Sequence, residues 1–207
     1  LESNACTCIT DVSKEADIES LINIAVEHFG GLNILFNNAG IGGAIGPITH
    51  IDGDEWDKSF QMLLKSVFLG CKYAARVMIK NNVGGSIINT ASIAGMGGGS
   101  GPLAYSAAKA GIINFCINAA IELGPNNIRV NAISPGPMKT LAGAAIGGAR
   151  KTFRHTESNA PLRSNATLNA VGGTAVYLAS EMGLYTTGEI IRVDGGSHVL
   201  GMPLSEN

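Results

Sequence analysis

Tyr105 and Lys109 are the two residues whose types and spacing could do acid–base chemistry. They lie four positions apart in AYSAAKAG (104–111), a segment rich enough in alanine to form a helix. This spacing places both side chains on one helix face, where a lysine ammonium favours the ionised form of a nearby phenol. We therefore predict that Lys109 lowers the pKa of Tyr105 from about 10 toward neutrality, which suits a general acid or base. The pair alone is weak support, because such spacing also arises by chance.

Ser92 strengthens this interpretation. It ends the apolar segment SIINTAS (86–92), which leads through a Gly-rich loop into the Tyr105 segment. A hydroxyl there could hold a substrate carbonyl oxygen while Tyr105 delivers the proton. The simpler alternative is a serine that caps a turn at the end of a strand. Together with the segment NNAG (37–40), the three residues favour the catalytic interpretation.

The elements that must position these residues alternate between strands and helices. Short apolar segments typical of strands cover 6–12, 33–40 with turn residues at its end, 86–92, 128–134 and 188–196. Helical periodicity covers a helix capped by Ser13 and stopped at Gly30–Gly31, residues 54–80, the Tyr105 segment up to Gly124–Pro125, and 170–180. Such alternation predicts a parallel sheet with helices on both faces, which binds ligands at the carboxyl ends of its strands.

Composition favours a single domain over residues 1–207 with a small-molecule partner. The formal net charge is −2, so no basic surface for nucleic acid or a membrane is expected. No apolar run is long enough to span a bilayer, and we expect a cytoplasmic protein, although a targeting segment ahead of Leu1 stays open. The four cysteines and four histidines lack metal-ligand spacing, so we expect free thiols and no metal.

These motifs resemble the short-chain dehydrogenase/reductase family. ITDV, FNNAGIG, SIINTASIAG, YSAAKAG, IRVNAISPGPMKT and GEIIRVDGG occur in the family's order along essentially the whole chain. The 13-residue step from Ser92 to Tyr105 also fits the family pattern. The resemblance implies an α/β, Rossmann-like, doubly wound parallel sheet in three αβα layers. It also implies an NAD or NADP cofactor, with hydride transfer between the nicotinamide and a hydroxyl or carbonyl carbon.

The resemblance further implies a role for each matching residue. Tyr105 would be the catalytic acid/base, Lys109 would lower its pKa and hydrogen-bond the nicotinamide ribose, and Ser92 would orient the substrate oxygen. The implied cofactor contacts are Asp11 and Val12 beside the adenine, Asn38, Ala39 and Gly40 along the adenosine, Pro135, Gly136 and Thr140 in the nicotinamide pocket, and the Ile133 backbone at the carboxamide.

Three features depart from the family pattern. The N-terminal strand with its Gly-rich turn is absent, so the first two strands of the order 3-2-1-4-5-6 would be missing between 6–12 and 33–40. Leu63 stands where the family has a helix asparagine that relays protons to the lysine. The segment from Gly136 onward resembles enoyl-acyl-carrier-protein reductases, whose tyrosine lies seven positions before the lysine, where this chain has Pro102.

The leading hypothesis is an NAD(P)-dependent oxidoreductase acting on a hydroxyl or carbonyl group. Its alternatives are reduction of an enoyl thioester, or a truncated, non-catalytic family member that serves as an oligomerisation partner. The C-terminal resemblance suggests a lipophilic substrate, with a pocket wall formed by Leu141, Ala142, Ile146 and Phe153. The family resemblance also implies a homo-oligomer, a dimer or tetramer, formed through residues 54–80 and the Tyr105 helix.

Overall fold

A parallel four-stranded sheet forms the centre of the protein. The computed structural model describes residues 4–140, 149–165 and 167–199. The strands lie in the order β1-β2-β3-β4, and every neighbouring pair is parallel. Their bounds are β1 Ile34–Asn37, β2 Gly85–Thr90, β3 Ile128–Pro135 and β4 Ile190–Val193. The sheet is therefore the Rossmann-like α/β arrangement that the alternating pattern predicts.

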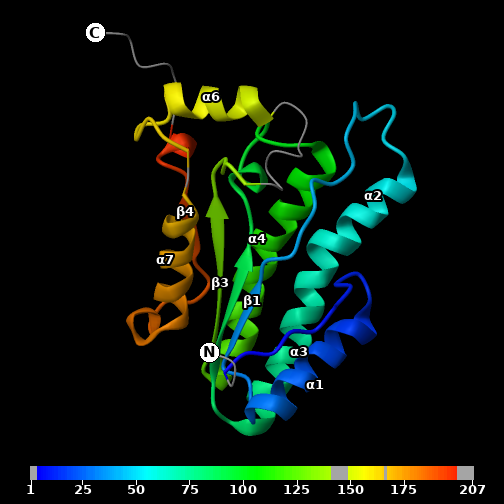
Figure 1. The fold of residues 1–207 in the computed structure, drawn as a ribbon, viewed down its shortest axis with the longest axis vertical. Helices are drawn as coiled ribbons and strands as arrows, with labels where there is room; N and C mark the ends of the chain where they lie inside the picture. Colours follow the sequence, from blue (N-terminus) through cyan, green and yellow to red (C-terminus); the bar gives the residue numbers. More distant parts are fainter. Residues whose placement is uncertain (1–3, 141–148, 166, 200–207) are drawn as a thin grey trace.

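Helices cover both faces of this sheet. Figure 1 shows α7 on one side of the strands and α1, α2 and α3 on the other. The helices are α1 Glu15–Phe29, α2 Gly53–Phe60, α3 Ser66–Asn81, α4 Leu103–Leu123, α6 Ala149–Asn159 and α7 Leu168–Ala179. The short turns are η2 Ile93–Gly95, η3 Gly124–Asn126, η4 Glu181–Gly183 and η5 Ser197–Val199. No helix in the described part of the chain is long and apolar enough to cross a membrane.

Alternating strand residues build a separate core on each face, because successive side chains of a strand point to opposite sides. Ile87 and Val130 pack with residues of α3 and α4 in the larger core. Ile88, one position after Ile87, and Ile133, three positions after Val130, pack with Leu178 of α7. The three αβα layers thus follow from the apolar strand sequences, which are buried on both faces.

The strand predicted over residues 6–12 is wrong. These residues pair with no described strand, and Ile9 is fully exposed. A strand requires a neighbour for its backbone hydrogen bonds, and within the described residues β1 pairs only with β2. The predicted cap at Ser13 is also wrong, because α1 begins after Lys14. Instead, the Asp11 carboxylate accepts the Ser13 N–H at 3.0 Å and its hydroxyl at 2.7 Å.

The helix predicted over residues 54–80 is interrupted. The Asp52 carboxylate caps its start by accepting N–H groups of the first turn, and α2 then runs to Phe60. A π-helical turn, η1 Gln61–Lys65, separates α2 from α3. Leu63 lies in this turn and is 1% exposed. Single π turns inside α-helices are frequent at functional sites, and this one carries the residue that departs from the family pattern.

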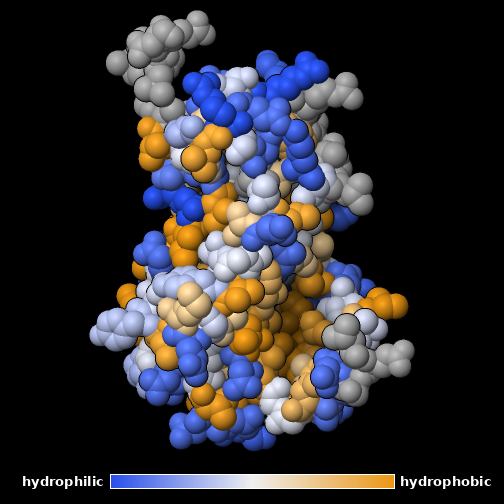
Figure 2. All heavy atoms as spheres, turned by 60° about the vertical axis from the view of Figure 1, so that its left-hand side comes forward, coloured by the Kyte–Doolittle hydropathy of each residue, from blue (hydrophilic) through white to orange (hydrophobic). Residues whose placement is uncertain are grey.

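The α7 face of the sheet is covered only in part. Ile34 and Phe36 lie on this face, because their register partners Ser86 and Ile88 both contact α7 through Leu178. Helix α7 packs on β2, β3 and β4, and it leaves Ile34 47% and Phe36 41% exposed. Figure 2 shows hydrophobic side chains gathered around a hollow in the surface. The β1 end of the sheet is therefore more exposed than its centre.

Candidate active site

Helix α4 presents Tyr105 and Lys109 to the carboxyl end of the sheet. Lys109 is 5% exposed, and its Nζ donates a hydrogen bond of 2.5 Å to the carbonyl oxygen of Thr90, the last residue of β2. The same ammonium lies 5.6 Å from the centre of the Tyr105 ring. The four-residue spacing thus brings the lysine and the phenol together, as the sequence predicts.

Ser92 follows β2 and joins this pair. Its Oγ accepts the N–H of Ala94 at 3.2 Å, so the serine does cap the turn η2. The turn packs closely on α4, since a Cβ added at Gly95 would lie 2.6 Å from the Ala110 nitrogen and from the Lys109 carbonyl carbon. The turn-capping alternative is therefore confirmed, and the turn that Ser92 caps is pressed against the helix that carries Tyr105 and Lys109.

The electrostatics of the pair differ from the prediction. Burial raises the pKa of Tyr105 above its usual value, and a hydrogen bond with Ser92 opposes that rise only in part. Burial also lowers the pKa of Lys109 to about 8. The prediction that Lys109 brings the Tyr105 pKa toward neutrality is wrong for this geometry. The Lys109 ammonium bonds the Thr90 carbonyl and lies beside the phenol ring, where both groups have lost water.

The residues implied for the adenosine end of a cofactor lie in two segments. One segment directly follows β1, and the other precedes α1. Asn38, Ala39 and Gly40 are exposed directly after β1, and the Asn38 Oδ1 accepts the Thr90 hydroxyl at 3.0 Å. Asp11 holds the start of α1 through Ser13, and its carboxylate also pairs with the Lys14 ammonium at 3.4 Å. Val12 packs against the larger core.

The residues implied for the nicotinamide end follow β3. Pro135 pairs with Val193, and the Gly136 N–H donates to the Val193 carbonyl at 3.0 Å. Ile133 is fully buried, and its carbonyl accepts the Ala91 N–H at 2.8 Å, so part of its backbone is already used. Thr140 lines a cavity of about 290 Å³ together with Met138, Lys139, Glu157, Asn165, Thr167 and Leu168.

The pocket wall predicted from the C-terminal resemblance falls mostly outside the described residues. Leu141, Ala142 and Ile146 lie in the part of the chain that the structure does not describe. Phe153 is in α6 and is partly buried.

Leu63 places an apolar side chain against the segment that follows β1. A Cβ added at Gly40 would lie 3.3 Å from the Leu63 Cδ2, so the side chain sits directly beneath the end of β1. Leu63 offers no hydrogen-bond donor or acceptor where the family has an asparagine. Any water held there must find its partners on other residues.

The residues present fit the nicotinamide ribose end of a dinucleotide. Lys109 has three N–H groups and, among described residues, one hydrogen-bond acceptor, which leaves donors for ribose hydroxyls. On the other side, Asp194 packs so tightly on Gly136 that a Cβ added there would lie 2.8 Å from the Asp194 Cβ, so position 136 has no room for a side chain. Among described residues, no group of three His, Cys, Asp or Glu side chains could hold a metal ion.

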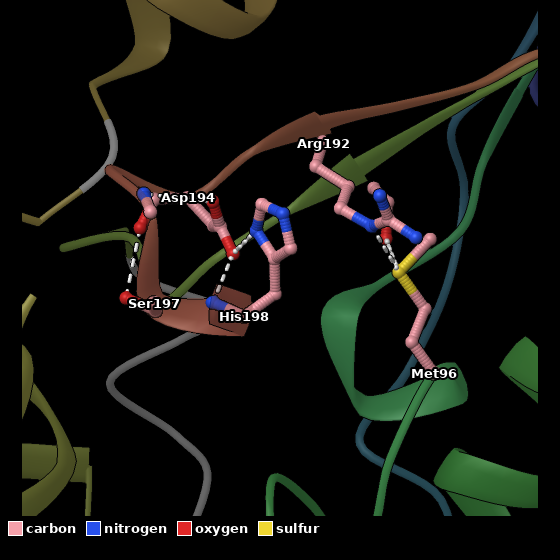
Figure 3. A network of polar contacts seen from close by, with 7 residues as sticks. Met96, Arg192, Asp194, Ser197 and His198 are labelled. Atoms are coloured by element: carbon pink, nitrogen blue, oxygen red, sulfur yellow. Dashed lines mark hydrogen bonds and ion pairs between the residues drawn. The ribbon is translucent and has the colours of Figure 1, made fainter. Parts of the chain in front are cut away.

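Several residues beside the predicted site carried no expectation from the sequence. Thr90 anchors both Lys109 and Asn38. Met96, Arg192, Asp194 and His198 form a further polar cluster, which Figure 3 shows. The segment GEIIRVDGG contains two of them, but its regular strand pattern does not reveal which side chains turn toward the site.

Comparisons with known proteins agree with the Rossmann-like fold and identify the family. The family model described as enoyl-(acyl carrier protein) reductase matches residues 1–198. The 3β-hydroxysteroid dehydrogenase 2 of Eggerthella lenta is 35% identical over 188 residues, covering 90% of this chain and 72% of that protein. The (+)-borneol dehydrogenase 2 of Salvia officinalis is 37% identical over 204 residues, covering 94% and 72%.

A solved structure is similar over nearly the same length. The enoyl-(acyl-carrier-protein) reductase from Anaplasma phagocytophilum, crystallised with NAD, has a TM-score of 0.87 at 30% identity, covering 97% of this chain and 76% of that one. The chain belongs to the short-chain dehydrogenase/reductase family, whose members use NAD(P).

Proposed function

We propose that this protein is an NAD(P)-dependent oxidoreductase that interconverts a secondary alcohol and the corresponding ketone. The observation that carries the proposal is the buried Lys109 ammonium, 5.6 Å from the Tyr105 ring, on a helix against which the Ser92 turn is packed. Burial of a lysine ammonium costs free energy, and buried groups with shifted pKa values are frequent at sites of proton transfer.

In this mechanism the residues bind the substrate oxygen and move one proton. A bound nicotinamide supplies hydride acceptance and donation. Ser92 Oγ donates a hydrogen bond to the substrate oxygen, and Tyr105 Oη gives that oxygen a proton during ketone reduction and removes it during alcohol oxidation. The Lys109 Nζ, which donates one hydrogen bond to the Thr90 carbonyl, has further N–H groups with which to position the nicotinamide ribose beside Tyr105.

The substrate class that we propose is an alicyclic secondary alcohol or ketone. The names of two relatives specify a hydroxysteroid and borneol, both of which carry the hydroxyl on a ring. Ile41 and Ile45, exposed in the loop after β1, supply apolar surface near the end of this strand. A lipophilic ring gains affinity by contact with such surface.

Reduction of an enoyl thioester is the second candidate, and the description of the matching family model favours it. The position seven residues before Lys109 argues against it. Pro102 occupies that position, at the N-cap of α4, and proline has no proton to donate. We therefore rank the alcohol dehydrogenase first.

The test compares Tyr105→Phe with the control Tyr185→Phe. Tyr105 supplies the proton, so its substitution should lower kcat by about 100-fold or more while leaving the dissociation constant for NADH or NADPH within about twofold. Tyr185 is fully exposed, and its substitution should change neither quantity. Turnover is measured by nicotinamide absorbance with cyclic ketones and an enoyl thioester, and cofactor binding by fluorescence titration.

The outcomes separate the candidates. Turnover of the enoyl thioester alone would favour the second function, and undiminished turnover in Tyr105→Phe would remove Tyr105 from its role. If the protein binds neither NADH nor NADPH, the oxidoreductase proposal is wrong and the non-catalytic alternative gains support.

A further inference from the structure

A cationic side chain stands beside the proposed active site without a carboxylate partner. Arg192 lies on β4 opposite Ser134 of β3, and Ser134 is followed directly by the Pro135–Gly136 segment implied for the nicotinamide. The Arg192 Nε donates a hydrogen bond of 3.2 Å to the Met96 sulfur, and Met96 caps the turn that Ser92 begins. Arg192 is therefore connected to both sides of the site.

The hydrogen bonding of Arg192 leaves most of its capacity unused. A thioether sulfur is a weak acceptor, and a guanidinium has five N–H donors. Within the described residues, no carboxylate lies within 4.0 Å of this guanidinium, although Lys–carboxylate ion pairs form elsewhere. The side chain is exposed. A planar fork with free donors matches the two oxygens of a carboxylate.

Asp194, two positions after Arg192, lies on the same face of the chain but does not neutralise it. Its side chain is 2% exposed and is saturated by other donors. Oδ1 accepts the Gly196 N–H at 3.0 Å, and Oδ2 contacts the His198 N–H at 2.9 Å and the His198 Nδ1 at 2.8 Å. The buried carboxylate therefore fixes the His198 ring.

The fixed imidazole adds a second polar group to this position. Figure 3 shows the His198 ring between Asp194 and Arg192, with the Met96 sulfur beside the guanidinium. Because Nδ1 is held by Asp194, Nε2 is the nitrogen left for a ligand. The His198 ring is thus fixed by the buried Asp194, and the Arg192 guanidinium is held by Met96 of the turn that Ser92 begins.

We propose that Arg192 and His198 bind a carboxylate of the substrate, so that the preferred substrate is an alicyclic hydroxy acid or keto acid. Arg192 makes the main contact and His198 the second, while the reacting carbon lies at Tyr105. This inference rests on the proposed oxidoreductase function and adds a charged group to its lipophilic substrate. A charge at one end and an apolar ring between it and Tyr105 would fix which ring carbon reacts.

The experiment compares 4-oxocyclohexanecarboxylate with its methyl ester, which react at the same carbon and differ in charge. Arg192→Met removes the guanidinium and keeps an unbranched side chain. It should lower the ratio of acid to ester kcat/KM by about 10- to 100-fold, as expected for a lost hydrogen bond to a charged group. His198→Ala should lower the same ratio by about 2- to 10-fold. The control Lys80→Met removes an exposed cation of α3 and should leave the ratio unchanged.

A binding measurement separates failure of this inference from failure of the proposed function. Cyclohexanecarboxylate is titrated by NMR into the wild-type protein and into Arg192→Met, with cyclohexanecarboxamide as the uncharged probe. Carboxylate binding that Arg192→Met abolishes supports the site, even where no ketone is turned over. Equal losses for acid and ester, an unchanged ratio, or equal binding of both probes overturns it.

Discussion

At the scale of single residues, Lys109 determines the chemistry of the site through its burial. Its ammonium is enclosed by α4 and the end of β2, and one backbone carbonyl accepts a hydrogen bond from it. Loss of water disfavours the charged form, which lowers the pKa of Lys109 to about 8. Burial also raises the pKa of Tyr105, so in this geometry the phenol keeps its proton.

This burial predicts a pH dependence of stability. The Lys109 pKa falls from 10.5 in the unfolded chain to about 8 in the folded protein, so the unfolded state binds more protons between these values. The free energy of unfolding of the wild type, relative to Lys109→Met, should therefore rise from pH 8 to 10.5, in total by about 3 kcal/mol. Urea denaturation at several pH values measures it, and a constant difference would contradict the burial argument.

Functional residues could be predicted from the sequence where their type and spacing on one element are sufficient. They could not be predicted where their properties depend on contacts with segments remote in sequence. Tyr105 and Lys109 share a helix face because of their spacing. The direction of the Tyr105 pKa depends on burial by neighbouring segments, which the spacing does not reveal. Arg192 shows the same limit, since its partner Met96 is remote in sequence.

At the scale of elements, the close packing of η2 on α4 joins Ser92 to the helix that carries the other two residues. Gly95 permits this contact, because any Cβ there would lie 2.6 Å from backbone atoms of α4. Gly98, three residues further along the same loop, has no atom within 4 Å of such a Cβ. The two glycines form a matched pair for testing the contact.

We expect Gly95→Ala to displace the Ser92 turn and to lower both stability and turnover. Overpacking of this kind costs about 1–3 kcal/mol, and a displaced serine should reduce kcat by about 10-fold or more. Gly98→Ala should leave both within experimental error. Urea denaturation and steady-state kinetics measure the effects, and equal behaviour of the two variants would show that the turn does not depend on this contact.

Element types could largely be predicted, since the strands are short apolar segments and the segment of α4 around Tyr105 is rich in alanine, a strong helix former. Helix α4 ends at Leu123, just before Gly124–Pro125, as expected. The predictions failed where the element type depends on pairing with another strand or on the local backbone geometry. Residues 6–12 have a strand-like composition, but no strand among the described residues pairs with them. The π turn at Leu63 has the same apolar spacing as a continuous helix.

At the scale of the whole molecule, the outer surfaces of α3 and α4 are unusually apolar. Phe68 of α3 is 46% exposed and packs edge-to-face on Phe115 of α4, with 6.4 Å between the ring centres. Ile117 and Ile121, four positions apart, add exposed apolar side chains on another face of α4. We propose that a second copy of this chain covers these surfaces, because a twofold pairing buries the same apolar helices on both copies.

The dimer proposal predicts that Ile121→Lys shifts the protein toward monomer. Ile121 is 74% exposed in one copy, so lysine should leave the fold intact, whereas at a twofold contact it brings two charges into an apolar interface. Ile48→Lys, at an exposed loop position away from α3 and α4, is the control and should keep the wild-type mass. Sedimentation velocity measures the mass and circular dichroism confirms the fold. A wild-type monomer, or a dimer retained in Ile121→Lys, would show that α3 and α4 do not form the interface.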